Sequence, residues 1–233
     1  MSLDLYEILA LSAAVIAILM LGTTHLRVNL WFYGVHTVVV AMMTWLIGTF
    51  STHHDEMFMP QFFGPLNISL QAHAVQAIFF GLFKGIAVPL FLMRIIRHIQ
   101  VESDSGTLLP TALTMHLNVL LLGASYLLAA QLPGLGVEGD SRIGAMAGMS
   151  LLFTGILLML TRRLAISQII GFLVMENGIY LFALTQTFGM PMIVEMGILL
   201  DVLVGVMITG LLLFGIKKSF EHIDVTQLTD LKD

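Results

Sequence analysis

The chain contains no cysteine and few charged residues, and both shortages limit what it does. With no cysteine among its 233 residues, it forms no disulfide and supplies no thiolate to an iron–sulfur cluster or to nickel. Any redox chemistry linked to this chain therefore takes place on another chain. Charged residues make up 11% of the sequence, whereas a soluble domain carries roughly a quarter. Hydrophobic residues make up 58%, which is typical of a membrane protein and excludes a nucleic-acid-binding domain.

The N-terminus lacks the basic residues of a signal peptide, since the first basic residue is Arg27. We therefore expect the first apolar run to be retained as a helix. The chain has seven apolar runs long enough to cross a bilayer, at about 5–24, 29–51, 69–96, 111–131, 143–161, 164–187 and 191–216. These runs predict an all-α fold, a polytopic membrane helix bundle of about seven transmembrane helices. Polar segments containing glycine and proline predict loops at 52–67 and 132–141.

The basic residues predict the orientation of the chain, because lysine and arginine near helix ends favour the cytoplasmic side. An outside N-terminus places Arg142 alone on the outer side and a cytoplasmic tail at 219–233. The other basic residues near helix ends then share the cytoplasmic side: Arg27, Arg94, Arg97, Arg162, Arg163, Lys217 and Lys218.

Two acids lie deep in the last two apolar runs, Glu176 and Asp201. A charge at that depth costs about 2.5 to 3.5 kcal/mol, and burial favours the protonated form of a carboxyl group. Such an acid is a candidate for taking and releasing protons, or else a permanently protonated hydrogen-bonding group. Asp201 shares a helix face with Gly197 and Gly205, so we expect it to face protein. Glu195 lies nearer the outer boundary, where it either reaches the interface or joins these acids.

The predicted third helix carries a stripe of residues at helical spacing: His73, Ala77, Phe80 and Lys84. A desolvated lysine loses its charge readily, and together with His73 it forms a candidate path for protons along the helix. Pro89 predicts a bend that loosens backbone hydrogen bonds near Lys84. The alternative for Lys84 is a static ion pair with Glu176 or Asp201.

The remaining histidines give weaker signals. His36 and His116 stand among apolar neighbours, a pattern that favours ordinary interhelical hydrogen bonds. The run from His53 to Glu56 contains metal-ligand residue types without the spacing of a metal site, so we predict a solvated loop and no metal.

The last three predicted helices contain two stretches with a distinctive pattern. Residues 150–185, SLLFTGILLMLTRRLAISQIIGFLVMENGIYLFALT, form a predicted helix, a basic turn and a helix with a central glutamate, Glu176. This stretch resembles the first two helices of the K-type (4L) subunit of respiratory complex I. The run EMGILLDVLVGVMITGLLLF is similar to its third helix, where an acid is followed four residues later by glycine, here Asp201 and Gly205. Two departures are the aspartate in place of glutamate, and Tyr180 in place of an asparagine.

With additional N-terminal helices, the whole chain resembles hydrogenase-4 component E. The resemblance implies a four-helix membrane region at 1–140, a K-like three-helix region at 141–218 and a cytoplasmic tail at 219–233. It further implies a membrane-arm subunit of a complex I-related [NiFe]-hydrogenase of the formate hydrogenlyase type, in a prokaryotic inner membrane. Peripheral hydrogenase subunits and antiporter-like and quinone-subunit-like membrane subunits are the implied partners. The nickel–iron and iron–sulfur centres are expected on those partners and no cofactor on this chain.

In such assemblies the membrane subunits couple redox work to movement of protons or other cations. The resemblance implies relay roles for Glu176 and Asp201, with Lys84 and His73 as auxiliary groups. It also implies that Arg162 and the adjacent Arg163 are topological anchors at the cytoplasmic entry.

Three other classes of protein fit part of the sequence. The first is a small subunit of a multi-subunit cation/proton antiporter, which has no need of residues 1–140. The second is a purely structural membrane subunit. The third is a seven-helix receptor or retinal protein, whose lysine belongs on the last helix, where this chain has Asp201.

Overall fold

The computed structural model describes residues 3–51, 77–78, 80–99, 102–104, 107–131, 140–187 and 205. All of the elements in these residues are helices, which confirms the predicted all-α class. They are α1 (Leu3–Gly22), α2 (Leu26–Ser51), the π-helical segment η2 (Phe80–Ala87), α4 (Val88–Ile99), α5 (Thr111–Gln131), α6 (Asp140–Thr161) and α7 (Ala165–Thr187).

Five of the described helices are long and apolar enough to cross a membrane: Leu5–Gly22, Leu26–Leu46, Thr111–Gln131, Arg142–Thr161 and Ala165–Gln186. They coincide with five of the predicted spans, so the chain is a multi-pass membrane protein. The predicted third span is described from residue 77 onward, as η2 and α4. The predicted seventh span and both predicted loops lie outside the described residues, apart from Gly205 and the first residues of α6. The count of seven stays a prediction.

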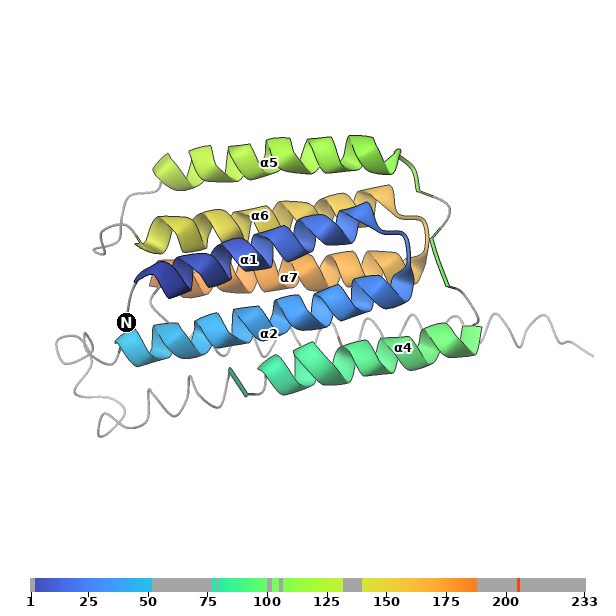
Figure 1. The fold of residues 1–233 in the computed structure, drawn as a ribbon, viewed down its shortest axis with the longest axis horizontal. Coiled ribbons are helices and arrows are strands. Elements are labelled where there is room, and N and C mark those ends of the chain that lie inside the picture. Colours follow the sequence, from blue (N-terminus) through green and yellow to red (C-terminus); the bar gives the residue numbers. More distant parts are fainter. Residues whose placement is uncertain are drawn as a thin grey trace, which may run out of the picture. The chain divides into compact units, whose positions relative to one another are not determined.

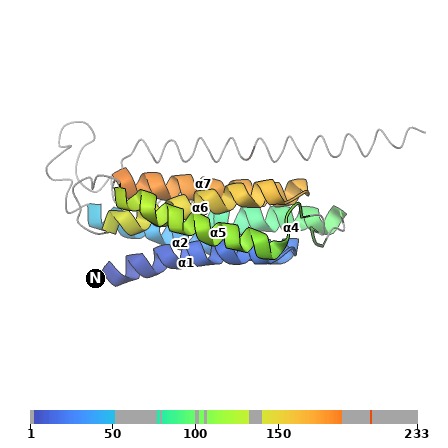
Figure 2. The ribbon, with the colours of Figure 1, turned by 90° about the horizontal axis from the view of Figure 1, so that it is seen from above.

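The chain divides into two compact units, residues 1–195 and 196–233, and the described helices belong to the first. Within it, α6 and α7 pack along each other, α1 packs on α2 and α6, and α5 packs on α6 (Figure 1). In addition, η2 and α4 pack on α2, which also contacts α7. Figure 2 shows the same bundle from above. The predicted N-terminal helices and the first two K-like helices therefore share one core.

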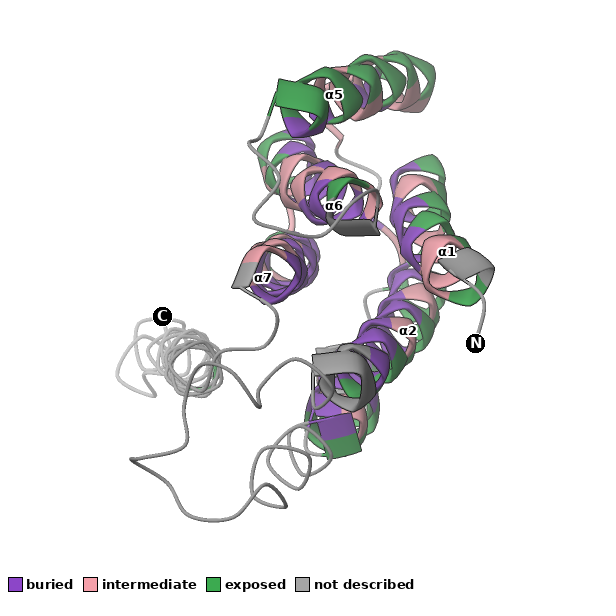
Figure 3. Ribbon diagram, turned by 90° about the vertical axis from the view of Figure 1, so that its left-hand side faces the viewer, coloured by how far each residue is buried: buried purple, intermediate pink, exposed green. Residues whose placement is uncertain are grey.

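Exposed and buried faces differ sharply among these helices (Figure 3). On α5 the large apolar side chains are mostly exposed, with Leu120 at 70% and Leu127 at 63%. By contrast, more than half of the residues in the membrane-spanning parts of α2, α6 and α7 are buried inside the protein. An exposed apolar face of this length suits contact with lipid, as expected for the outer helices of a membrane bundle.

Glycines bring α6 and α7 into close contact. A Cβ atom on Gly155 would lie 2.6 Å from the carbonyl oxygen of Gly171, and one on Gly148 would lie 2.6 Å from the amide nitrogen of Phe182. A Cβ atom on Gly178 would lie 2.7 Å from the carbonyl oxygen of Gly148. Small residues at such positions let membrane helices pack backbone to backbone. The face of α7 that carries Gly171 and Gly178 is therefore held against α6.

A buried arginine joins the ends of α1 and α6 at one end of the bundle. Arg162, just after α6, donates from Nη2 to the carbonyl oxygens of Leu21 (3.0 Å) and Thr23 (2.7 Å), at the end of α1. Asp104 is also buried and accepts a hydrogen bond from the backbone amide of Leu164 at 3.2 Å. Burial lowers the pKa of Arg162 from its ordinary value, while the nearby Asp104 carboxylate acts in the opposite direction.

Arg162 therefore has a different environment from the one implied by the sequence. The sequence implies a pair of topological anchors, yet Arg162 is only 3% exposed and bonds the last carbonyls of α1. A cation favours the negative end of a helix dipole, which explains this position. Arg163 is exposed and remains free to act as the predicted anchor.

Candidate functional site

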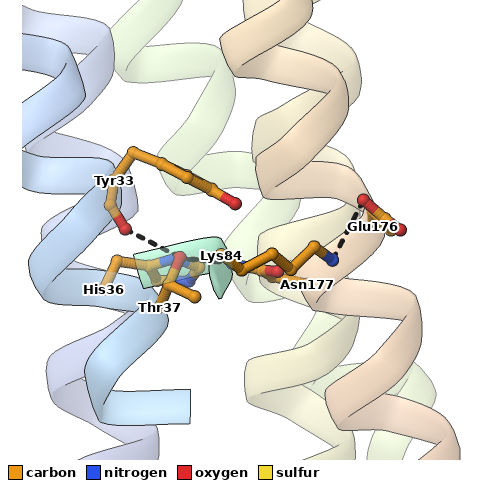
Figure 4. A network of polar contacts seen from close by, with 6 residues as sticks. All are labelled: Tyr33, His36, Thr37, Lys84, Glu176 and Asn177. Carbon is orange, nitrogen blue, oxygen red and sulfur yellow. Dashed lines mark hydrogen bonds and ion pairs between the residues drawn. The ribbon is translucent and has the colours of Figure 1, made fainter. Parts of the chain in front are cut away.

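Lys84 and Glu176 form a buried ion pair inside the bundle. Nζ of Lys84 lies 3.0 Å from Oε2 of Glu176, and their side chains are only 3% and 2% exposed (Figure 4). Lys84 comes from η2 and Glu176 from the middle of α7. Of the two partners that the sequence left open for Lys84, the structure thus brings Glu176 to it. Asp201 lies outside the described residues.

The backbone around Lys84 departs from a regular α-helix. Lys84 lies in the middle of η2, a π-helical segment that ends two residues before Pro89. Proline has no amide hydrogen, so it cannot bond the preceding turn, and π-helical turns are frequent at functional sites. The sequence predicted loosened hydrogen bonds here but not a π-helix. Of the predicted stripe, Ala77, Phe80 and Lys84 are buried as expected, while His73 lies outside the described residues.

Two glycines allow η2 to approach α2. A Cβ atom on Gly34 would lie 2.9 Å from the carbonyl oxygen of Gly85, and one on Gly85 would lie 3.2 Å from a methyl carbon of Val38. Any larger side chain at Gly34 would push against a backbone atom. This contact fixes the depth at which Lys84 enters the space between α2 and α7.

An aromatic pair supports the charge of Lys84. Its Nζ lies 4.6 Å from the centroid of the Phe80 ring, within the range of a cation–π interaction. Phe80 in turn stacks on Tyr180 of α7, with ring centroids 4.6 Å apart. The hydroxyl of Tyr180 lies 3.2 Å from Oγ1 of Thr44 on α2. Tyr180 differs from the asparagine of the K-type pattern, and no role was predicted for it. In the structure it links α7 to η2 and α2 beside the ion pair.

A hydrogen-bonded amide lies beside Glu176 (Figure 4). Nδ2 of Asn177 donates to Oγ1 of Thr37 at 2.9 Å and lies 3.3 Å from Nδ1 of His36. The hydroxyl of Thr37 donates to the backbone carbonyl of Tyr33 at 2.8 Å. Asn177, His36 and Thr37 are all fully buried, so polar groups of α2 and α7 meet next to the ion pair.

The two lone histidines have different outcomes. The interhelical hydrogen bond predicted for His36 is confirmed by its contact with Asn177. His116 is exposed on α5, and its Nδ1 lies 2.6 Å from the carbonyl oxygen of Ala112 in the same helix. The prediction for His116 was wrong, because no helix covers that face of α5 among the described residues.

The polar face of α2 was not predicted, although the sequence carries a signal for it. Polar side chains recur along α2 at helical spacing and all of them are buried: Asn29, Tyr33, His36, Thr37 and Thr44. In a membrane helix such a stripe indicates a face that packs on protein. Asn177 does not belong to a comparable stripe in the sequence. It stands next to Glu176, whose charge already explains a polar position at this point of α7.

The geometry permits a proton to move between Lys84 and Glu176. At 3.0 Å the contact holds either an ammonium and a carboxylate or an amine and a carboxylic acid. Both states have zero total charge, which limits the cost of burying them. The pair can therefore change its dipole by moving one proton without placing a net charge in the bundle.

Several predicted site residues remain untested by this geometry. Asp201, His73 and Glu195 lie outside the described residues, and so does the run from His53 to Glu56. Within the residues that are described, no group of three or more histidine and acidic side chains could hold a metal ion.

Five apolar spanning helices, with a Lys84–Glu176 pair enclosed between them, define a multi-pass membrane protein with an internal charge pair. One relative is the uncharacterized protein Rv0085 of Mycobacterium tuberculosis, which is 30% identical to this chain over 152 residues. The match covers 64% of this chain and 68% of the relative, and the chain belongs to the same family as that protein. No family model and no solved structure matches the chain.

Proposed function

We propose that this chain is a membrane-arm subunit of a complex I-related, membrane-bound [NiFe]-hydrogenase of the hydrogenase-4 or formate hydrogenlyase type. Its role is to carry protons, or another cation, through buried acidic and basic groups while partner subunits perform the redox chemistry. It lies in the prokaryotic inner membrane with the N-terminus outside and the C-terminus cytoplasmic.

The observation that carries the relay role is the enclosed pair of Lys84 and Glu176 at 3.0 Å. A buried ion pair adds little to stability compared with apolar residues of the same volume. Ionisable side chains within membrane helices are accordingly concentrated at ion and proton pathways. The neighbouring polar groups of α2 and α7 extend this pair into a network that crosses between helices.

The hydrogenase assignment is supported by the residues that resemble the K-type subunit. The predicted basic turn falls between α6 and α7, and the predicted central glutamate, Glu176, is the buried partner of Lys84. The absence of cysteine agrees with redox centres on other subunits. A small antiporter subunit shares the K-like helices and is the second candidate, favoured by the same ion pair. A purely structural subunit is the third.

Proton movement in membrane vesicles tests the relay role. Inverted vesicles that contain the assembled complex are supplied with hydrogen or formate, and proton uptake is followed with a pH-sensitive dye. We expect Glu176→Gln to abolish uptake while co-purification shows a complete complex. Glu7→Gln, a partly exposed acid of α1, serves as the matched control and retains uptake. Normal uptake in Glu176→Gln would refute the relay role.

The partners test the assignment to a hydrogenase. A tag on the C-terminus, mild detergent and mass spectrometry identify the subunits that accompany the chain. Recovery of a [NiFe]-hydrogenase large subunit with iron–sulfur and antiporter-like subunits supports the proposal. Recovery with cation-antiporter subunits alone would replace it with the second candidate.

A further inference from the structure

The hydrogen bonds around Asn177 fix where the proton of His36 lies. Thr37 has one hydroxyl hydrogen, which it donates to the Tyr33 carbonyl, so its 2.9 Å contact with Asn177 must receive a hydrogen from Nδ2. The second Nδ2 hydrogen is then directed to Nδ1 of His36 at 3.3 Å. Nδ1 is therefore the acceptor, and a neutral His36 carries its hydrogen on Nε2.

Two buried atoms of this cluster have no hydrogen-bond partner among the described residues. They are Nε2 of His36, which carries the hydrogen, and Oδ1 of Asn177, which is a strong acceptor. An unpaired polar atom costs more in a low-dielectric interior than at the surface, so such atoms call for an explanation. Both atoms belong to the cluster that adjoins the ion pair, and the side chain of Lys84 extends past His36 and Asn177 toward Glu176 (Figure 4).

We propose that His36 is a proton-accepting residue that alternates with Lys84 as the holder of one positive charge, and that Asn177 is its positioning residue. The inference rests on the relay role proposed above and extends it from α7 and η2 to α2. In the transfer, one N–H bond breaks at Nζ of Lys84 and one forms at Nδ1 of His36, with water as the carrier. The total charge is unchanged.

A turn of the Asn177 amide accommodates the added proton. When Nδ1 of His36 gains a hydrogen, it can no longer accept from Nδ2, so the amide turns and presents Oδ1 instead. The hydroxyl of Thr37 then donates its one hydrogen to Oδ1 instead of to the Tyr33 carbonyl. That carbonyl keeps its helical backbone donor. Asn177 makes two hydrogen bonds in each state, through nitrogen in one and through oxygen in the other. The unpaired Oδ1 is explained as the acceptor of the second state.

The charged groups nearest to His36 come from η2 and α7. The charged residue on η2 is Lys84, and the charged residue on α7 is its partner Glu176. Tyr180 follows Glu176 by one turn of α7. α1 bears its titratable residues, Asp4, Tyr6 and Glu7, in its first turns, and α4 bears Arg94, Arg97 and His98 in its last turns. On α2 itself the titratable neighbour is Tyr33. A positive Lys84 opposes a positive His36, so the two sites hold the charge in turn.

Nitrogen NMR of the full chain tests this role directly. The chain is labelled with ¹⁵N-histidine, purified in lipid nanodiscs and observed at about pH 6. His36 is assigned by comparison with His36→Gln, and His116→Gln is the matched control. We expect wild-type His36 to be the neutral Nε2–H form. In Lys84→Met the imidazolium signal of His36 should rise above that of the wild type, whereas Lys84→Arg, which keeps the charge, should leave it unchanged.

A second variant keeps the test valid if Lys84→Met does not fold. In Asn177→Ala nothing directs a hydrogen to Nδ1, so His36 should show both neutral tautomers. A single unchanged Nε2–H form in both variants would overturn the proposal. These spectra need only this chain, so they can fail while the hydrogenase assignment holds. Recovery with antiporter subunits alone would refute that assignment and leave the His36 result intact.

Discussion

Lys84 is held by three kinds of contact at once: an ion pair with Glu176, a ring face of Phe80, and the close approach of Gly85 to α2. Each contact comes from a different part of the fold, so the position of its ammonium depends on the packing of η2, α2 and α7 together. The stability of the bundle should therefore respond strongly to changes in this one side chain.

Lys84→Met should destabilise the protein by about 3 kcal/mol, because it leaves Glu176 buried without its partner. The double variant Lys84→Met, Glu176→Gln should recover most of that loss, since no charged group then remains. Thermal unfolding in detergent, analysed as a double-mutant cycle, measures both effects. Equal destabilisation by the single and double variants would contradict the coupling.

Individual site residues could be found from the sequence, but their pairing could not. The depth of Glu176 and Lys84 in apolar runs marks both as unusual. Whether Lys84 meets Glu176 or Asp201 depends on the rotation of each helix about its axis, which is decided by tertiary packing. Asn177 escaped notice, and His36 was predicted only as an ordinary hydrogen-bonding residue, because a single buried polar residue has the same local pattern whether or not it joins a network.

Different faces of one helix make different kinds of contact. On α7, Gly171 and Gly178 face α6, while Glu176, Asn177 and Tyr180 contact α2 or η2. The glycine contacts and the polar contacts therefore lie on different sides of one helix. Substitutions on each side should have separable effects.

Gly155→Ala should destabilise the protein by about 2 kcal/mol or more, because the new Cβ atom would meet the backbone of Met175 and Gly171. Gly123→Ala is the matched control, since nothing lies within 4 Å of the Cβ position at Gly123 on α5. That control should be neutral or stabilising, as alanine favours the helix. Thermal unfolding of the two variants decides the point, and equal loss in both would argue against close packing of α6 and α7.

Gly34→Ala should reduce proton uptake without removing any ionisable group, because its Cβ atom would displace the backbone at Gly85 and with it Lys84. Gly81→Ala is a suitable control in the same π-helical segment, where the nearest atom, Cβ of Ala41, is 3.5 Å away. Uptake in vesicles is the measurement. Full uptake in Gly34→Ala would show that the depth of η2 is unimportant.

Hydrophobic run length predicts helix positions well here, and it fails at the details of helix geometry. The bounds of α5 match the predicted run residue for residue, because nothing but apolar length defines a span. The π-helical turn at Lys84 arises from contacts with α2 and from Pro89 together. Proline alone indicates a disturbance and does not specify its type.

At the scale of the whole molecule, Arg162 ties α1 to the turn between α6 and α7. Arg162→Gln should destabilise the protein by about 2 kcal/mol, because the carbonyls of Leu21 and Thr23 lose a charged donor. Arg163→Gln changes an exposed neighbour and should be nearly neutral. The two unfolding temperatures provide the comparison, and equal values would contradict the role of Arg162.

Membrane orientation can be measured cleanly because the chain has no cysteine. Arg163→Cys and Arg142→Cys introduce single thiols at opposite ends of α6. A membrane-impermeant maleimide applied to intact cells and to inverted vesicles should label them from opposite sides, with Arg163→Cys reached only in vesicles. Labelling of Arg163→Cys from outside intact cells would reverse the proposed orientation.

The glycine contact between α6 and α7 has a mechanical consequence. Two backbones in direct contact leave no side chains to rearrange, so α7 is poorly suited to sliding or rotating during a reaction cycle. The backbone that carries the Glu176 carboxylate is therefore expected to stay in place. In the proposed relay, displacements that accompany charge movement therefore fall to η2. Hydrogen exchange should accordingly be faster at the amides around Lys84 than at those around Glu176.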